Sequence, residues 1–248
     1  MFRTNLSRLL HSLGPIDART VQRDEMLRWM ILLPLVVALA IRWVVPLLVQ
    51  RIDGWLPLDL AALYPPFMAY AALILVPFLW GTIGGFLLLD QRDDGTLLAL
   101  QVTPLPAATF LAYRLLLPTL LSVASSALVL PLTGLLQLSP LQWFLAAVSA
   151  APLAPLLALA LSTLAQNKVQ GLALMKASGL VMLPPWLAPF LPAAWQWPLA
   201  LLPTYWPAQY LWRLDAGSSA LFFLLAGLAY QGLLLGLLSR RFRRVMRR

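Results

Sequence analysis

The 248-residue sequence contains no cysteine, one histidine and only nine acidic residues. The lack of cysteine excludes a disulfide framework, a thiolate metal site and a cysteine nucleophile. The single histidine, His11, leaves little room for imidazole chemistry. Charged residues make up 11% of the chain, against about 25% in a typical soluble domain. The chain is therefore poor in the side chains on which most soluble enzymes depend.

Apolar residues take the place of the missing charges, at 61% of the chain. This excess is too large for a bigger core to explain, so lipid must be the solvent for much of the surface. A membrane-spanning helix needs about 20 consecutive apolar residues. Six stretches meet this requirement, at about 26–49, 66–89, 110–136, 141–164, 171–190 and 218–238. We predict an all-α, polytopic integral membrane protein with six transmembrane helices in one membrane domain, residues 26–238.

The net charge of +9 lies in short segments beside the apolar stretches. This pattern indicates membrane orientation and argues against a nucleic-acid partner. Arginines precede the first predicted span and crowd a basic tail, residues 239–248, whereas the loops on the opposite side contain only Arg51 and Arg213. The positive-inside rule therefore places both termini in the cytoplasm, with the tail against anionic lipids.

Two segments outside the regular spans have distinctive compositions. Residues 1–25 place leucines at helical spacing opposite polar residues, which predicts an amphipathic helix on the inner membrane surface. Within it, Gly14-Pro15 is expected to end one helix and Asp17 to cap the next. Residues 184–212 are rich in proline and tryptophan, which predicts a re-entrant stretch of short helices in the outer leaflet, between spans five and six. A plain aromatic anchor is the alternative.

The connection between spans two and three, residues 90–109, is the longest one predicted on the cytoplasmic side apart from the termini. Gly95 allows a sharp turn, after which Thr96 can cap a short amphipathic helix. The pair Thr103-Pro104 then favours the start of the next helix. The candidate functional residues are Asp94, Gly95, Thr96, Leu97, Leu100, Thr103 and Pro104. A short helix hinged at both ends is suited to passing force from a soluble motor to membrane helices.

The run Asp94-Gly95-Thr96-Leu97, followed by Thr103-Pro104, resembles the signature after the second span of ABC-2-type permeases. The likeness extends along the whole chain, from the amphipathic N-terminal helix to the basic C-terminus. The opening Leu13-Gly14-Pro15-Ile16-Asp17-Ala18-Arg19 is similar to that of bacterial fluoroquinolone and multidrug export permeases. The sequence departs from the family at Leu98, where an acidic residue is common. In such permeases this connection is expected to contact a separate ATPase subunit. A polar contact to that subunit is therefore missing here, or has moved to Asp93 or Asp94.

This resemblance implies a dimer of permease subunits in the bacterial inner membrane, each docked on an ABC ATPase subunit through residues 90–109. It also implies outward transport of a substrate, for which the apolar walls favour a hydrophobic or amphipathic molecule. A P-loop needs Gly-x-x-x-x-Gly-Lys-Ser/Thr, and neither Lys168 nor Lys176 has this context. We therefore expect no enzyme activity and no cofactor in this chain, with ATP and Mg²⁺ bound by the separate ATPase.

Arg42 is the one candidate residue within a span, about 18 Å of helix beyond Met30. It either lines the substrate path and meets an anionic group, or reaches the outer surface and pairs with Asp53 or Asp59. Two alternative functions also stay open. One is a haem-export-type permease for cytochrome maturation. The other is a membrane-embedded lipid-modifying enzyme that holds Mg²⁺ between Asp90 and Asp94.

Overall fold

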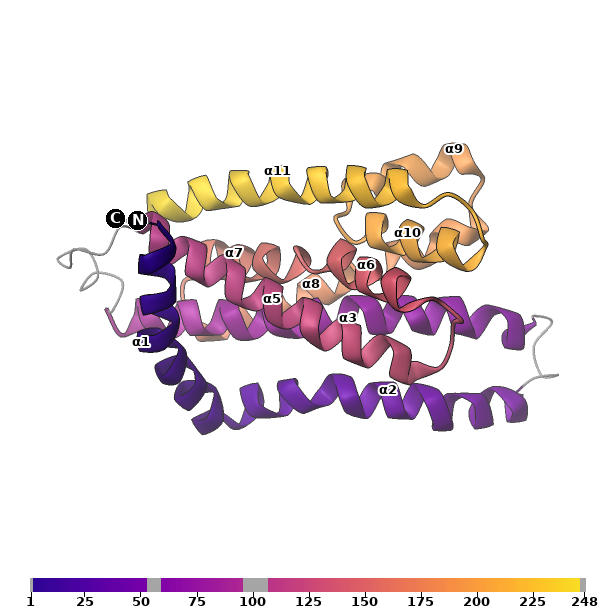
Figure 1. The fold of residues 1–248 in the computed structure, drawn as a ribbon, viewed down its shortest axis with the longest axis horizontal. Coiled ribbons are helices and arrows are strands. Elements are labelled where there is room, and N and C mark those ends of the chain that lie inside the picture. The colour runs from indigo at the N-terminus through magenta and orange to yellow at the C-terminus, as the bar shows by residue number, and fades with distance from the viewer. Residues whose placement is uncertain (1, 53–58, 96–106, 246–248) are drawn as a thin grey trace.

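The computed structural model describes residues 2–52, 59–95 and 107–245, and its regular elements are all helical. Six helical stretches of this part of the chain are long and apolar enough to cross a membrane. They are Glu25–Ile52, Leu60–Asp93, Thr109–Thr133, Pro140–Leu164, Lys168–Phe190 and Leu221–Phe242. The predicted all-α architecture with six transmembrane segments is thus confirmed. Figure 1 shows the long helices running along the longest axis of the molecule, with both termini at one end, here named the terminal end.

The helices of the bundle are α1 (Phe2–Arg23), α2 (Glu25–Ile52), α3 (Leu60–Asp93), α5 (Ala107–Thr133), α6 (Pro140–Ala150), α7 (Leu153–Leu164), α8 (Lys168–Leu180), α10 (Tyr205–Asp215) and α11 (Leu221–Val245). Helix α3 is central and contacts α2, α5, α7 and α8. It lies very close to α7: a Cβ added at Gly81 would be 2.5 Å from the carbonyl oxygen of Ala154. One added at Gly85 would be 2.7 Å from Leu161 Cδ1. Small residues four apart allow two membrane helices this approach.

Helix α1 crosses the terminal end of the bundle, transverse to the long helices (Figure 1). The expected break at Gly14-Pro15 is wrong, since α1 runs without interruption from Phe2 to Arg23 with Pro15 inside it. Asp17 is not a helix cap, because it is buried and paired with Arg114 of α5. This tertiary contact lies in the turn that follows the internal proline, which itself removes one helical hydrogen bond.

Several predicted spans differ in detail from the observed helices. The fourth breaks between α6 and α7 at Ala151 and Pro152, where the chain forms a turn. The fifth begins slightly earlier, at Lys168, and ends as an α-helix at Leu180. The second begins at Leu60 and continues through Pro65 and Pro66. Pro65 and Pro66 lie past the first turn, where helical bonding has already begun with Leu63 N to Asp59 O, so each removes one helical hydrogen bond; helices of membrane proteins tolerate such losses.

The stretch before α11 consists of short helices, as expected. They are η1 (Pro184–Phe190), α9 (Ala193–Gln196), η2 (Trp197–Leu201) and α10. Figure 1 places α9 and α10 at the end of the bundle away from the termini. Aromatic rings connect this stretch to α3: Phe67 stacks on Phe190 at 5.7 Å and lies 5.9 Å from Trp186, edge to face. Tyr70 also donates a hydrogen bond to the carbonyl oxygen of Met182 at 3.0 Å.

Candidate functional site

The connection between α3 and α5 joins two helix ends at the terminal end of the bundle (Figure 1). Thr96, Leu97, Leu100, Thr103 and Pro104 lie outside the described residues. The two remaining candidates begin the connection: Asp94 is exposed and caps α3, and Gly95 follows it. The N–H of Gly95 donates to Arg92 O at 3.1 Å, and its φ of +68° is left-handed. The sharp turn expected at Gly95 is therefore present, whereas its part in coupling stays a prediction.

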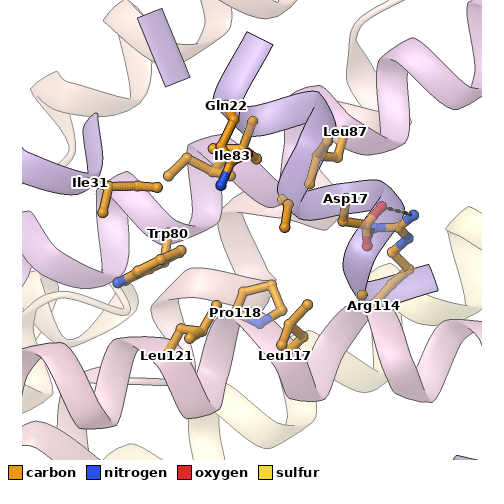
Figure 2. A pocket seen from close by; sticks show the side chains of 14 residues that line it. Asp17, Gln22, Ile31, Trp80, Ile83, Leu87, Arg114, Leu117, Pro118 and Leu121 are labelled. Atoms are coloured by element: carbon orange, nitrogen blue, oxygen red, sulfur yellow. Dashed lines mark hydrogen bonds and ion pairs between the residues drawn. The ribbon is translucent and has the colours of Figure 1, made fainter. Parts of the chain in front are cut away.

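The N-terminal helix α1 is joined to α5 by a buried ion pair. Both Nη atoms of Arg114 donate to the Asp17 carboxylate, at 2.9 and 3.1 Å, and Tyr113 Oη donates to the same group at 2.7 Å. Figure 2 shows the pair at one end of a pocket. Asp17 is 5% exposed and Arg114 3%. The Arg114 guanidinium also lies 5.4 Å from the centre of the Phe110 ring. A charge this deeply buried depends on its partner, so the two helices are held in register.

A second ionic cluster joins the residue before α2, Asp24, to the last turns of α3 and to the first residue of α8. Lys168 Nζ lies 2.9 Å from Asp24 Oδ2 and 3.3 Å from Asp90 Oδ1. Burial disfavours the charged Asp24, but the hydrogen bonds from Lys168 and the backbone of Leu27 outweigh this, so the pKa of Asp24 lies below its ordinary value of 3.8. Arg92 Nη1 donates to Ala165 O at 3.0 Å. The last turns of α3 are thus fixed to α8 and to the α1–α2 junction.

Both flanks of the α3–α5 connection are therefore attached to the N-terminal region. Asp90 fixes the end of α3 through Lys168 and Asp24, and Arg114, on the second turn of α5, fixes the start of α5 to Asp17. A displacement of the connection cannot move α5 alone, because an uncompensated buried charge at Asp17 or Arg114 would be costly. Ion pairs thus connect the N-terminal region to both α3 and α5 at the terminal end of the bundle.

Arg42 lies on an exposed face of α2, where its Nη1 donates to Leu132 O at 3.2 Å. This carbonyl belongs to the last turn of α5, whose carbonyl groups lack helical partners and carry the negative end of the helix dipole. The guanidinium also lies against Gly134, which has a φ of +66°. Asp59, one expected partner, instead caps α3 by accepting from Ala62 N, and Asp53 is outside the described residues. A place on the substrate path stays a prediction for Arg42.

The sequence reasoning missed both ionic clusters. The sequence assigns no partner to Arg114 or Lys168, and it leads us to expect Asp17 as a helix cap. A stronger signal was present for Arg114, because an arginine seven residues into an apolar helix is expensive in a membrane without a partner. Among the described residues, no three His, Cys, Asp or Glu side chains gather to form a metal site. Asp90, proposed for Mg²⁺, is instead paired with Lys168.

An apolar pocket of about 430 Å³ lies between α3, α7, α8 and α11. A second pocket, of about 310 Å³, adjoins the Asp17–Arg114 pair between α1, α2, α3 and α5. Arg42 lines neither of the two.

Comparison with known proteins places these features in a family. The family model described as "Fluoroquinolones export permease protein Rv2686c-like" matches residues 17–239, from the buried Asp17 into the last span. The fluoroquinolones export permease proteins Rv2686c and MT2760, from two strains of Mycobacterium tuberculosis, are each 28% identical to the chain over 241 residues. The alignments cover 95% of this chain and 94% of each relative. The chain is therefore a membrane permease that belongs to the Rv2686c-like family of fluoroquinolones export permeases.

Proposed function

We propose that the chain is the membrane subunit of an ABC-type exporter, driven by an ATPase on a separate polypeptide. The substrate is a hydrophobic or amphipathic drug-like molecule, and the names of the relatives favour a fluoroquinolone. The family match favours drug export over the haem-export and lipid-modifying alternatives. ATP and Mg²⁺ are bound by the partner ATPase, and two permease subunits form the pathway between them.

The observation that carries this proposal is the attachment of both flanks of residues 90–109 to ionic clusters at the terminal end. A segment docked on a motor needs rigid connections to the helices that it moves. The Asp17–Arg114 pair and the Asp24–Lys168–Asp90 cluster would provide them, on either side of the hinge at Gly95. In this arrangement ATP-driven closure of two ATPases displaces the segment and, with it, α3 and α5, a domain-scale two-state motion.

We further propose that the terminal end faces the cytoplasm of a bacterium, across the inner membrane. The support is the positive-inside rule, since the basic tail and the arginines of residues 1–25 belong to this end. The domain division follows: residues 1–25 as the interfacial helix, 26–238 as the membrane domain with a re-entrant part at 184–212, and 239–248 as the tail. In this orientation the short helices α9 and α10 lie toward the outer leaflet.

The coupling proposal is tested with a matched pair of glycine variants, Gly95→Pro and Gly217→Pro. The two glycines have φ values of +68° and +63°, and each N–H donates to a carbonyl three residues earlier at 3.1 Å. Proline removes both features at either site, so the local structural cost is alike. Only the Gly95→Pro substitution, beside the α3–α5 connection, is expected to abolish drug-stimulated ATP hydrolysis.

The measurement combines a mild-detergent pull-down of the tagged permease with an ATPase assay on the co-purified complex. The wild type is expected to bring down a Walker-type ATPase, and replacement of residues 95–104 by a Gly/Ser linker is expected to lose it. Drug-stimulated hydrolysis that survives in Gly95→Pro, or falls equally in Gly217→Pro, would count against coupling through this segment. A permease that purifies without any ATPase would refute the ABC assignment itself.

A further inference from the structure

The pocket beside the Asp17–Arg114 pair, here named the α1 pocket, has a volume of about 310 Å³, within the range of small-molecule sites. Four helices contribute its walls. Its lining includes Ala18 and Gln22 of α1, Ile31 of α2, Trp80 and Ile83 of α3, and Leu117, Pro118 and Leu121 of α5. Figure 2 shows these side chains around a common space, with the ion pair at one end and Trp80 toward the other.

The two ends of the α1 pocket differ in chemistry. At one end the Nε of Arg114 is buried and has no hydrogen-bond partner, although both Nη atoms reach Asp17. Because Nε has no accessible surface, this end of the pocket is a closed ion pair that offers a ligand no free donor. At the other end Trp80 Nε1 donates to Ser125 Oγ at 2.9 Å, which fixes the indole ring. A fixed indole offers a flat apolar face for stacking.

The pocket opens at the surface of the bundle, near the start of α2, which the proposed orientation places in the inner leaflet. Ala18, Gln22 and Ile31 line it and are all exposed. Ile31 lies six residues beyond Glu25, about 9 Å of helix from the charged end of α2. This depth corresponds to one leaflet of a hydrocarbon layer about 30 Å thick. A molecule dissolved in that leaflet, with a polar group near the headgroups, could enter without crossing water.

We propose that the α1 pocket binds the ring system of a planar aromatic amphiphile, a class to which the fluoroquinolones belong. The rings stack on the indole of Trp80, which Ser125 holds in place. The inference rests on the proposed export function and assigns its drug-entry site.

The test measures equilibrium binding of a radiolabelled fluoroquinolone to the purified permease in lipid nanodiscs, without the ATPase. Ile31→Trp places an indole across the pocket mouth, and Leu32→Trp places one on the neighbouring position of α2. The two residues are similarly exposed, at 40% and 48%, and only Ile31 lines the pocket. We expect Ile31→Trp to weaken binding about tenfold or more, the scale of an overpacked site, and Leu32→Trp to bind as wild type.

A second occluding variant, Ala18→Trp, approaches the pocket from α1 at an exposed position and is expected to have the same effect. Because these measurements use the permease alone, they are independent of ATPase docking. Loss of export or of the ATPase partner with intact, pocket-dependent binding would refute the proposed function and leave the site standing.

Unchanged affinity in both Ile31→Trp and Ala18→Trp would overturn the site. A wild-type permease that does not bind the radiolabelled fluoroquinolone would overturn the ligand class. Native mass spectrometry distinguishes a lipid occupant: if both variants lose a bound phospholipid while the drug affinity stays constant, the pocket is a lipid site and the proposal fails. Competition between the drug and that phospholipid in the wild type, abolished in the variants, would support it.

Discussion

Separation of the Asp17–Arg114 pair is expected to be the most damaging polar change in the described part of the molecule. The guanidinium makes two hydrogen bonds to the carboxylate, at 2.9 and 3.1 Å, and neither side chain is more than 7% exposed. Removal of one member of such a pair typically costs about 3–5 kcal/mol, because the other charge stays buried without compensation. For a domain of this size that corresponds to a melting temperature lowered by roughly 10 °C.

The assay is a double-mutant cycle of Asp17→Asn and Arg114→Met, followed by thermal unfolding of the detergent-solubilised chain. Each single variant is expected to be destabilised by the full cost of an unpaired buried charge, about 3–5 kcal/mol. The double variant, which leaves no charged group at this site, is expected to lose little stability, because replacing both members of a buried pair is often nearly neutral; the coupling energy then approaches the sum of the two single losses. Arg19→Gln, on an exposed position of the same helix, is the control and should change little.

Additive losses within about 0.5 kcal/mol would refute the reasoning, since they would mean that the two side chains do not depend on each other. The same double variant separates stability from coupling. Once it is well folded, α1 and α5 no longer share an ion pair, so drug-stimulated ATP hydrolysis should fall although the protein melts near the wild-type temperature. Full stimulation in a stable double variant would remove α1 from the force-transmitting unit.

Three further predictions concern packing, a helix cap and pH. Gly81→Ala places a methyl group 2.5 Å from Ala154 O and should destabilise by about 3 kcal/mol, whereas Gly236→Ala, in open space, should be neutral or stabilising; equal melting temperatures would contradict the close α3–α7 contact. Arg42→Ala should melt a few degrees lower through loss of the α5 cap, yet export normally; lost export at unchanged stability would instead place Arg42 on the substrate path. Because the pKa of Asp24 is lowered when folded, its carboxylate stabilises the fold above pH 3.8, and this contribution disappears as the pH falls below that value. The melting curves of wild type and Asp24→Asn should therefore converge in acid, and a difference that persists there would exclude ionisation as its cause.

The six spans could be predicted from the sequence because lipid imposes one simple requirement on each. A helix that crosses a bilayer must be apolar for about 20 residues, and this requirement can be seen without knowledge of its neighbours. The short helices at 184–212 could be predicted for a related reason, since closely spaced prolines prevent a long helix. Their exact bounds depend on local hydrogen bonds, and the break at Pro152 divides a stretch that hydropathy alone presents as continuous.

The ionic clusters could not be predicted in the same way, because their members are far apart in the chain. Asp17 and Arg114 are 97 residues apart, and Lys168 and Asp24 are 144 residues apart. A single sequence shows that a charge beside a membrane span needs a partner, but not which one. The positive-inside rule also gave each of these cations a sufficient explanation by itself. The glycines of α3 could have been recognised, since Gly81 and Gly85 have the spacing of close helix contacts.

The two ends of the bundle are held by different forces, and this bears on how the permease would move. At the terminal end, directional ion pairs connect α1, α3, α5 and α8. At the opposite end, aromatic rings of α3 pack against short proline-rich helices. Ion pairs tolerate little displacement once buried, whereas aromatic surfaces can slide at small cost. A push on the α3–α5 connection should therefore move the terminal end as a unit and be absorbed by rearrangement around Trp186 and Trp212. Disulfide pairs across each end would test this, because a cross-link at the aromatic end should arrest transport while one between α1 and α5 should be tolerated.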